Sequence, residues 1–199
     1  MNDLDIIHDH NINIKDRIIY LHQVDIEDSI SFKTIPGLIK SLDYLNSVNK
    51  SLITIKLISC DGGDIGPGMS AYSAIRSSKS KVNIECSGFT ASCSTLILQA
   101  ANIRSVSKDG FFMIHFGSIS LSTDVNTAQS ILVSNTLWKN QLLNIYASRC
   151  VNGKFFKDRK YNLNRVRGYI NTRLKNSGDW YIKDAEEIIN FGFADKIME

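Results

Sequence analysis

The chain has 199 residues, 43% of them apolar, and a formal net charge of +3. This length and composition suit one globular domain, expected to span residues 1–199. The small positive charge gives no reason to expect a nucleic-acid partner. No run of 18 apolar residues occurs, so no membrane span is expected, and the early acidic residues of the N-terminus do not resemble a secretory signal.

The four cysteines give no sign of a metal site or a disulfide framework. Cys60, Cys86, Cys93 and Cys150 have neither metal-ligand spacing nor a C-x-x-C pair. We therefore expect reduced, buried thiols and no cofactor bound by this chain.

Strands and helices are expected to alternate along the first part of the chain. Strands are predicted at 17–24, 51–59, 81–88, 103–107 and 111–117, and helices at 34–47, with Thr34 as N-cap, at 66–78 and at 92–102. The first strand–helix–strand unit implies a parallel crossover. The alternation predicts an α/β fold with a largely parallel sheet.

The second part of the chain begins with a long predicted helix at 124–150. Its apolar residues face more than one side, which fits either a contact between subunits or burial within the monomer. The stretch 151–176 carries eight Lys or Arg residues against the single acid Asp158, and is either a solvated face or a docking surface for an acidic partner. Residues 183–198 are expected to form a helix that stops at Gly192, then a strand.

Two strand-to-helix junctions could hold reactive groups. The loop "CDGGDIGPG" (60–68) follows a buried strand, where ligands bind in parallel sheets, and its glycines let backbone N–H groups approach a ligand. In "GFTASC", Ser92 opens a helix, and the N–H that follows such a serine can help to bind an oxyanion. A tight turn and a capping serine are the ordinary alternatives.

Two further residues could complete an acyl-transfer site. His115 ends the apolar strand "FFMIHFG", and Asp179 lies in the polar turn "NSGDWY". A buried histidine and a capping aspartate are the usual interpretations, but these residue types are also the base and the orienting group that a serine nucleophile requires.

These motifs resemble, in order and spacing, those of ClpP-type serine peptidases. The resemblance covers about residues 17–198 and rests on "SCDGGDIGPGMSAYSAI", "GFTASC", "FMIHF" and "SGDWYIKDAEEIINFGFADKI". It implies a ClpP/crotonase-like fold: mostly parallel sheets, flanking helices, a head of about 17–123 and 177–198, and a handle helix at about 124–150. Residues 151–176 would be a basic insertion.

The resemblance also implies roles for five residues. Ser92 would be the nucleophile, His115 the base and Asp179 the group that orients it, while the N–H groups of Gly62 and Cys93 would form the oxyanion hole. The sequence departs from the family pattern at Asp61, which replaces a proline, and also at Thr90, Cys93, Phe116 and Gly117.

As partners, the resemblance implies copies of the chain itself, stacked as rings, often of seven subunits, or a mixed ring with a paralogue. An AAA+ Clp ATPase would unfold polypeptide substrates and consume the ATP. The location would be the cytoplasm, an organelle stroma or matrix, or a host cytoplasm. Alternatives are a non-catalytic subunit of a mixed ring, a capsid-maturation or signal-peptide-type peptidase, and an acyl-CoA crotonase of the same fold.

Overall fold

The computed structural model describes residues 3–22 and 30–198, so residues 23 and 24 of the first predicted strand lie outside the described part. The elements in chain order are α1 (Asp3–His10), β1 (Ile12–Asn13), β2 (Ile18–His22), α2 (Ile35–Val48), β3 (Ile53–Cys60), α3 (Ile65–Arg76), β4 (Val82–Ala91), α4 (Cys93–Leu98), β5 (Ile103–Val106), β6 (Phe111–Ile114), α5 (Val125–Cys150), α6 (Lys154–Asp158), α7 (Leu163–Ser177), β7 (Trp180–Ile182), α8 (Ala185–Asn190) and β8 (Lys196–Ile197).

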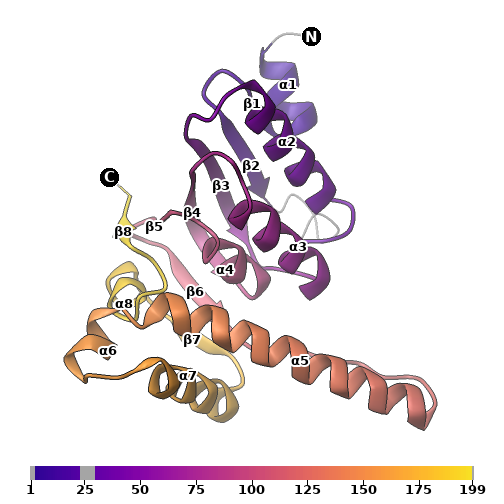
Figure 1. Cartoon of the computed structure of the whole chain (residues 1–199), viewed down its shortest axis with the longest axis vertical. Helices are drawn as coiled ribbons and strands as arrows, with labels where there is room; N and C mark the ends of the chain where they lie inside the picture. The colour runs from indigo at the N-terminus through magenta and orange to yellow at the C-terminus, as the bar shows by residue number, and fades with distance from the viewer. Residues whose placement is uncertain (1–2, 23–29, 199) are drawn as a thin grey trace.

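Within these residues, eight strands form one sheet whose main path is β1-β2-β3-β4-β5-β8. Pairing along this path is parallel except between β1 and β2, and the sheet core is apolar, as the β-branched runs predict. Figure 1 shows the helices packed around the sheet, with the long α5 crossing below it.

On the side away from β3, the strand β4 has two parallel partners along its length. Residues 83–86 pair with β5, whereas residues 89–91 pair with β6. The strand β6 in turn pairs antiparallel with β7. The sheet therefore branches at β4, and the branch brings the ends of three strands together beside the start of α4.

Two of the predicted helices differ in detail. Thr34 occupies the predicted N-cap position of α2, but its backbone is helical and its side chain makes no capping hydrogen bond; its hydroxyl instead accepts a hydrogen bond from the amide of Ser31 (3.1 Å). The helix predicted at 92–102 ends at Leu98, since the next three amides bond to carbonyls three residues back and so tighten the chain into a 3₁₀ turn.

The long helix α5 divides into two halves that differ in burial. Its buried residues, which all lie in the C-terminal half, are Leu142, Leu143, Ile145, Tyr146, Ala147 and Cys150. In the N-terminal half Leu132, Val133 and Leu137 are 51%, 62% and 66% exposed. This half extends beyond the body of the molecule (Figure 1). Burial within the monomer thus accounts for one half of the apolar pattern and leaves the other half uncovered.

The basic stretch forms α6 and α7. Val166, Ile170 and Leu174 form the buried face of α7. Arg167 is not free to bind a partner, because its guanidinium donates hydrogen bonds to Asn144 (2.8 Å) and Asn140 (2.7 Å) of α5. At least part of the positive charge therefore holds α7 against the long helix. No helix in the described ranges is long and apolar enough to span a membrane.

Candidate active site

Strand register alone brings Ser92, His115 and Asp179 together. Ala91 of β4 pairs with Met113 of β6, so the residue after β4 lies beside the end of β6. Ile114 pairs with Trp180 of β7 in the antiparallel sense. His115 therefore follows β6 at the point where Asp179 precedes β7, and both lie next to Ser92.

The three side chains form a continuous hydrogen-bonded chain. His115 Nε2 lies 2.8 Å from Ser92 Oγ, and His115 Nδ1 lies 3.0 Å from Asp179 Oδ1. With its proton on Nδ1, the imidazole donates to the carboxylate and leaves Nε2 free to accept the proton of the serine. This arrangement suits general-base activation of a hydroxyl nucleophile.

Ser92 is held in a strained backbone conformation. Its φ of 51° and ψ of −123° are rare for a residue with a side chain. Such conformations cost of the order of 1–3 kcal/mol and persist where neighbours fix them. Here the amide of Ser92 donates to the carbonyl of Met113 (2.8 Å), and its carbonyl accepts from the hydroxyl of Thr95 (2.7 Å). The strain directs the side chain out of the strand-to-helix turn toward His115.

The two glycines of the predicted oxyanion loop have different surroundings. Gly62 is buried against the nucleophile, and a Cβ there would lie 2.7 Å from the Cβ of Ser92. Gly63 is exposed and lines the cavity in front of Ser92. The sequence analysis named only Gly62, since the two adjacent glycines look alike until their φ angles, +107° and +151°, are known, and its role stays a prediction.

A cavity of about 550 Å³ opens beside Ser92 and His115. Its apolar wall comes from Ile65, Phe116, Ile119, Ile131, Trp138 and Leu142, and its charged groups are Asp61, Asp64 and Lys139. A hollow that combines an apolar wall with charged and polar groups suits a side chain of a bound substrate. A larger hollow of about 1190 Å³ lies between α1, β2 and α2, but no predicted site residue lines it.

The thiol of Cys93 is a poor rival for the hydroxyl of Ser92. Cys93 is only 5% exposed, and burial raises the pKa of its thiol to about 11. The reactive form of cysteine is the thiolate, which this environment disfavours at neutral pH. The hydroxyl of Ser92 is therefore the better candidate for the nucleophile.

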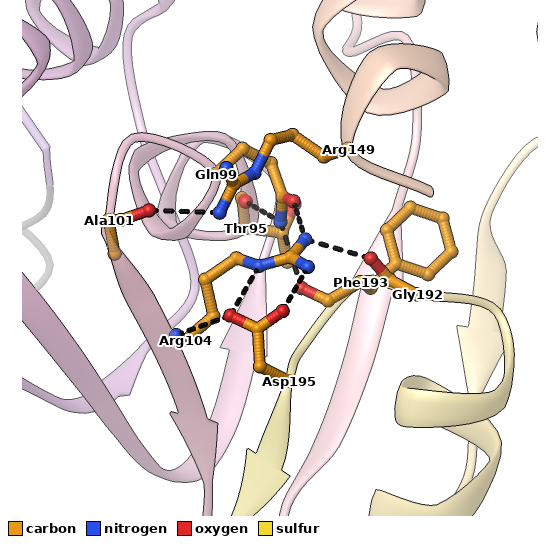
Figure 2. Close-up of polar contacts among 8 residues, drawn as sticks. All are labelled: Thr95, Gln99, Ala101, Arg104, Arg149, Gly192, Phe193 and Asp195. Carbon is orange, nitrogen blue, oxygen red and sulfur yellow. Dashed lines mark hydrogen bonds and ion pairs between the residues drawn. The ribbon is translucent and has the colours of Figure 1, made fainter. Parts of the chain in front are cut away.

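A buried polar network anchors the helix α4 behind Ser92 (Figure 2). The side-chain amide of Gln99 donates to the carbonyls of Thr95 (3.0 Å) and Phe193 (3.2 Å), and its oxygen accepts from Arg104 (2.7 Å). Arg104 also forms an ion pair with Asp195. Burial alone would raise the pKa of the Asp195 carboxyl, but hydrogen bonding and charge from Arg104 outweigh burial and lower it. The network ties α4 to the C-terminal segment.

Across residues 3–22 and 30–198, no group of three or more His, Cys, Asp or Glu side chains could hold a metal ion. The Ser92–His115–Asp179 chain has the residue types of an acyl-transfer site.

Both the sequence and the fold of this chain are similar to those of known proteins. The family model of the Clp protease matches residues 7–199, so the chain belongs to the Clp protease family. No match was found among curated proteins. Among solved structures, a point mutant of ClpP1 from Listeria monocytogenes is similar with a TM-score of 0.75 and 18% identity, over 94% of this chain and 93% of that chain. The predicted ClpP-type resemblance and fold are thus confirmed.

Proposed function

We propose that this protein is a serine endopeptidase that hydrolyses unfolded polypeptides through an acyl-enzyme, as the proteolytic subunit of an ATP-dependent Clp protease. The observation that carries the proposal is the hydrogen-bonded chain from Ser92 through His115 to Asp179, at the mouth of an apolar cavity. Membership of the Clp protease family supports it.

In the proposed reaction, Ser92 Oγ forms a bond to the scissile carbonyl carbon while its proton passes to His115 Nε2. The C–N bond then breaks, and the imidazolium returns that proton to the leaving amine. A water molecule next attacks the ester, giving its proton to His115, which restores it to Ser92 Oγ as the carboxylic acid leaves. Asp179 stabilises the imidazolium and holds the useful tautomer throughout.

Both tetrahedral intermediates carry a negative oxygen that needs hydrogen-bond donors. We assign one donor to the N–H of Cys93, at the first position of α4, where no carbonyl within the helix can accept from it. The second belongs to the Gly62–Gly63 turn. The sequence favours Gly62, whereas the position of Gly63 on the cavity wall favours Gly63.

Assembly is part of the same proposal. The uncovered N-terminal half of α5 presents Leu132, Val133 and Leu137 on a projecting helix, and a second copy of the chain would cover it as rings stack. Rings of seven, or mixed rings, would enclose the sites, and an AAA+ Clp unfoldase would deliver substrates and use the ATP, in the cytoplasm or an equivalent compartment.

Labelling with a fluorophosphonate probe tests the nucleophile directly. The wild type should be labelled and should cleave an unfolded polypeptide. Ser92→Ala should lose labelling and about 10⁴-fold or more of the hydrolysis rate, as expected when one member of such a unit is removed. Ser94→Ala is the matched control, since this buried serine lies in α4, two residues after Ser92. A wild type that is folded and assembled but never labelled would instead support a non-catalytic subunit.

A further inference from the structure

The carbonyl of Ser92 accepts one side-chain hydrogen bond, from the hydroxyl of Thr95, besides those from the backbone amides of Thr95 (3.1 Å) and Leu96 (3.4 Å). The hydroxyl of Thr95 lies 2.7 Å from this carbonyl and 2.6 Å from the hydroxyl of Tyr146. A carbonyl only accepts, and the threonine hydroxyl has one proton, so Thr95 donates to Ser92. Thr95 must then accept the proton of Tyr146. The phenol of Tyr146 on α5 is therefore the first donor in a chain that ends on the backbone carbonyl of Ser92.

Both hydroxyl residues are buried and held in place. Thr95 is fully buried, and Tyr146 is 1% exposed. The ring of Tyr146 packs edge-on against Phe193 at 5.6 Å. The carbonyl of Thr95 is fixed from the other side by Gln99, as Figure 2 shows. Burial also raises the pKa of the Tyr146 phenol, which keeps it protonated and able to donate.

The acceptor at the end of this chain shares a peptide unit with a proposed oxyanion donor. The carbonyl of Ser92 and the N–H of Cys93 belong to one planar peptide group, and the described residues contain no cis peptide bond. In a trans peptide the two groups point in opposite directions. The two amides hold the carbonyl along the helix, and the shorter bond from the Thr95 hydroxyl (2.7 Å) fixes it further, which keeps the Cys93 N–H pointing away from the helix interior and toward the side of Ser92.

We infer that Tyr146 is a positioning residue, which acts through Thr95 to orient the Ser92–Cys93 peptide and so to aim the oxyanion donor. This inference rests on the proposed serine-peptidase function. It assigns to the buried half of α5 a role in the reaction itself, besides its packing. Loss of the phenol hydroxyl weakens binding of the transition state and leaves binding of the substrate nearly unchanged.

The test compares kcat and KM for a fluorogenic peptide in the full-length, assembled protein. Tyr146→Phe should lower kcat about fivefold and Thr95→Val about tenfold, both below the roughly 10²–10³-fold effect of losing an oxyanion donor outright. KM should stay within about twofold, and a peptide boronate should lose affinity in parallel with kcat/KM. Thr95→Ser keeps the hydroxyl and should restore most of kcat.

A double variant distinguishes this relay from general loosening of the site. Because Tyr146 acts only through Thr95, Tyr146→Phe combined with Thr95→Val should be no slower than Thr95→Val alone. Tyr169→Phe is the control, since it removes a phenol hydroxyl from the aromatic cluster beneath α7 and should leave kcat unchanged. Rates are expressed per active site, titrated with the fluorophosphonate probe, so that partly unfolded variants do not distort kcat.

The outcomes separate the two levels of inference. Three results would each overturn the relay while leaving the peptidase assignment intact. They are losses of kcat that multiply in the double variant, an unchanged kcat in Tyr146→Phe, and a loss of kcat in Tyr169→Phe equal to that in Tyr146→Phe. A wild type that neither cleaves peptide nor reacts with the probe would refute the proposed function, and the positioning role with it.

Discussion

Adding one methyl group at Gly62 should disable the site without removing any reactive group. In Gly62→Ala the new Cβ would lie 2.7 Å from the Cβ of Ser92, 2.9 Å from the carbonyl oxygen of Ala91 and 3.0 Å from the nitrogen of Cys93. None of these atoms can rotate away, because they belong to the backbone or are fixed to it.

The size of the effect follows from these distances. Ordinary carbon–carbon contacts are about 3.5–4.0 Å, so the loop and the nucleophile must separate by roughly 1 Å. A misplacement of that size can cost about 10²-fold in rate. The left-handed φ of +107° adds a backbone cost of about 1–3 kcal/mol, and overpacking adds about 1–3 kcal/mol more. At roughly 2–4 °C for each kcal/mol, the melting temperature should also fall clearly.

Gly192 offers a matched control for Gly62. It has a similar φ of +80°, and a Cβ there would meet the backbone of Gly153 at 2.9 Å, but it lies in the C-terminal segment. Gly192→Ala should therefore lower the melting temperature comparably while keeping the peptide-cleavage rate per folded molecule. Equal cleavage rates in Gly62→Ala and Gly192→Ala, each measured below its melting temperature, would refute the reasoning.

Three further predictions concern stability and assembly. Asp195→Asn should lower the free energy of unfolding in urea by about 2–3 kcal/mol, less than for a fully buried ion pair because the carboxylate is 38% exposed. The exposed control Asp158→Asn should lower it by less than about 0.5 kcal/mol. Since the pKa of Asp195 is lowered in the fold, the stability difference between the wild type and Asp195→Asn should shrink as pH falls below about 4. A difference that stays constant with pH would contradict the ion pair of Asp195 with Arg104. Burial raises the pKa of thiols such as that of Cys93, so unfolded thiols release protons that folded ones retain, and the free energy of unfolding should decrease above pH 9. A free energy of unfolding that is independent of pH up to 10.5 would contradict the raised pKa. Leu137→Asp should reduce the assembly to smaller species in sedimentation, whereas Leu163→Asp on α7 should not, and identical profiles would rule out α5 as the contact.

The sequence predicts the elements whose signals are local. The β-branched runs of β3 and β4, the first followed by a glycine loop and the second by the small residues Ser92 and Cys93, define two strand-to-helix turns without reference to the rest of the chain. The strand β7 could not be found in this way, because its three residues become a strand only by pairing with β6. The helix α1 has no buried residue, so its sequence lacks the apolar stripe by which helices are recognised.

The same distinction applies to the site. Ser92, His115 and Asp179 are marked by the motifs around them. Tyr146 is not, because a tyrosine on an apolar helix face is indistinguishable from an ordinary core residue until its hydroxyl is seen beside Thr95. The exposure of Gly63 rather than Gly62 likewise depends on dihedral angles that the letters of a glycine pair do not specify.

The antiparallel pairing of β6 with β7 also bears on how the protein is made. Asp179 follows His115 by 64 positions in the chain, with the whole of α5, α6 and α7 between them. A ribosome therefore completes the strand before Ser92 long before it supplies the partner of His115. Under the proposed function, each nascent chain would lack a complete triad until its last strands are synthesised and paired, and so would not cleave neighbouring unfinished polypeptides.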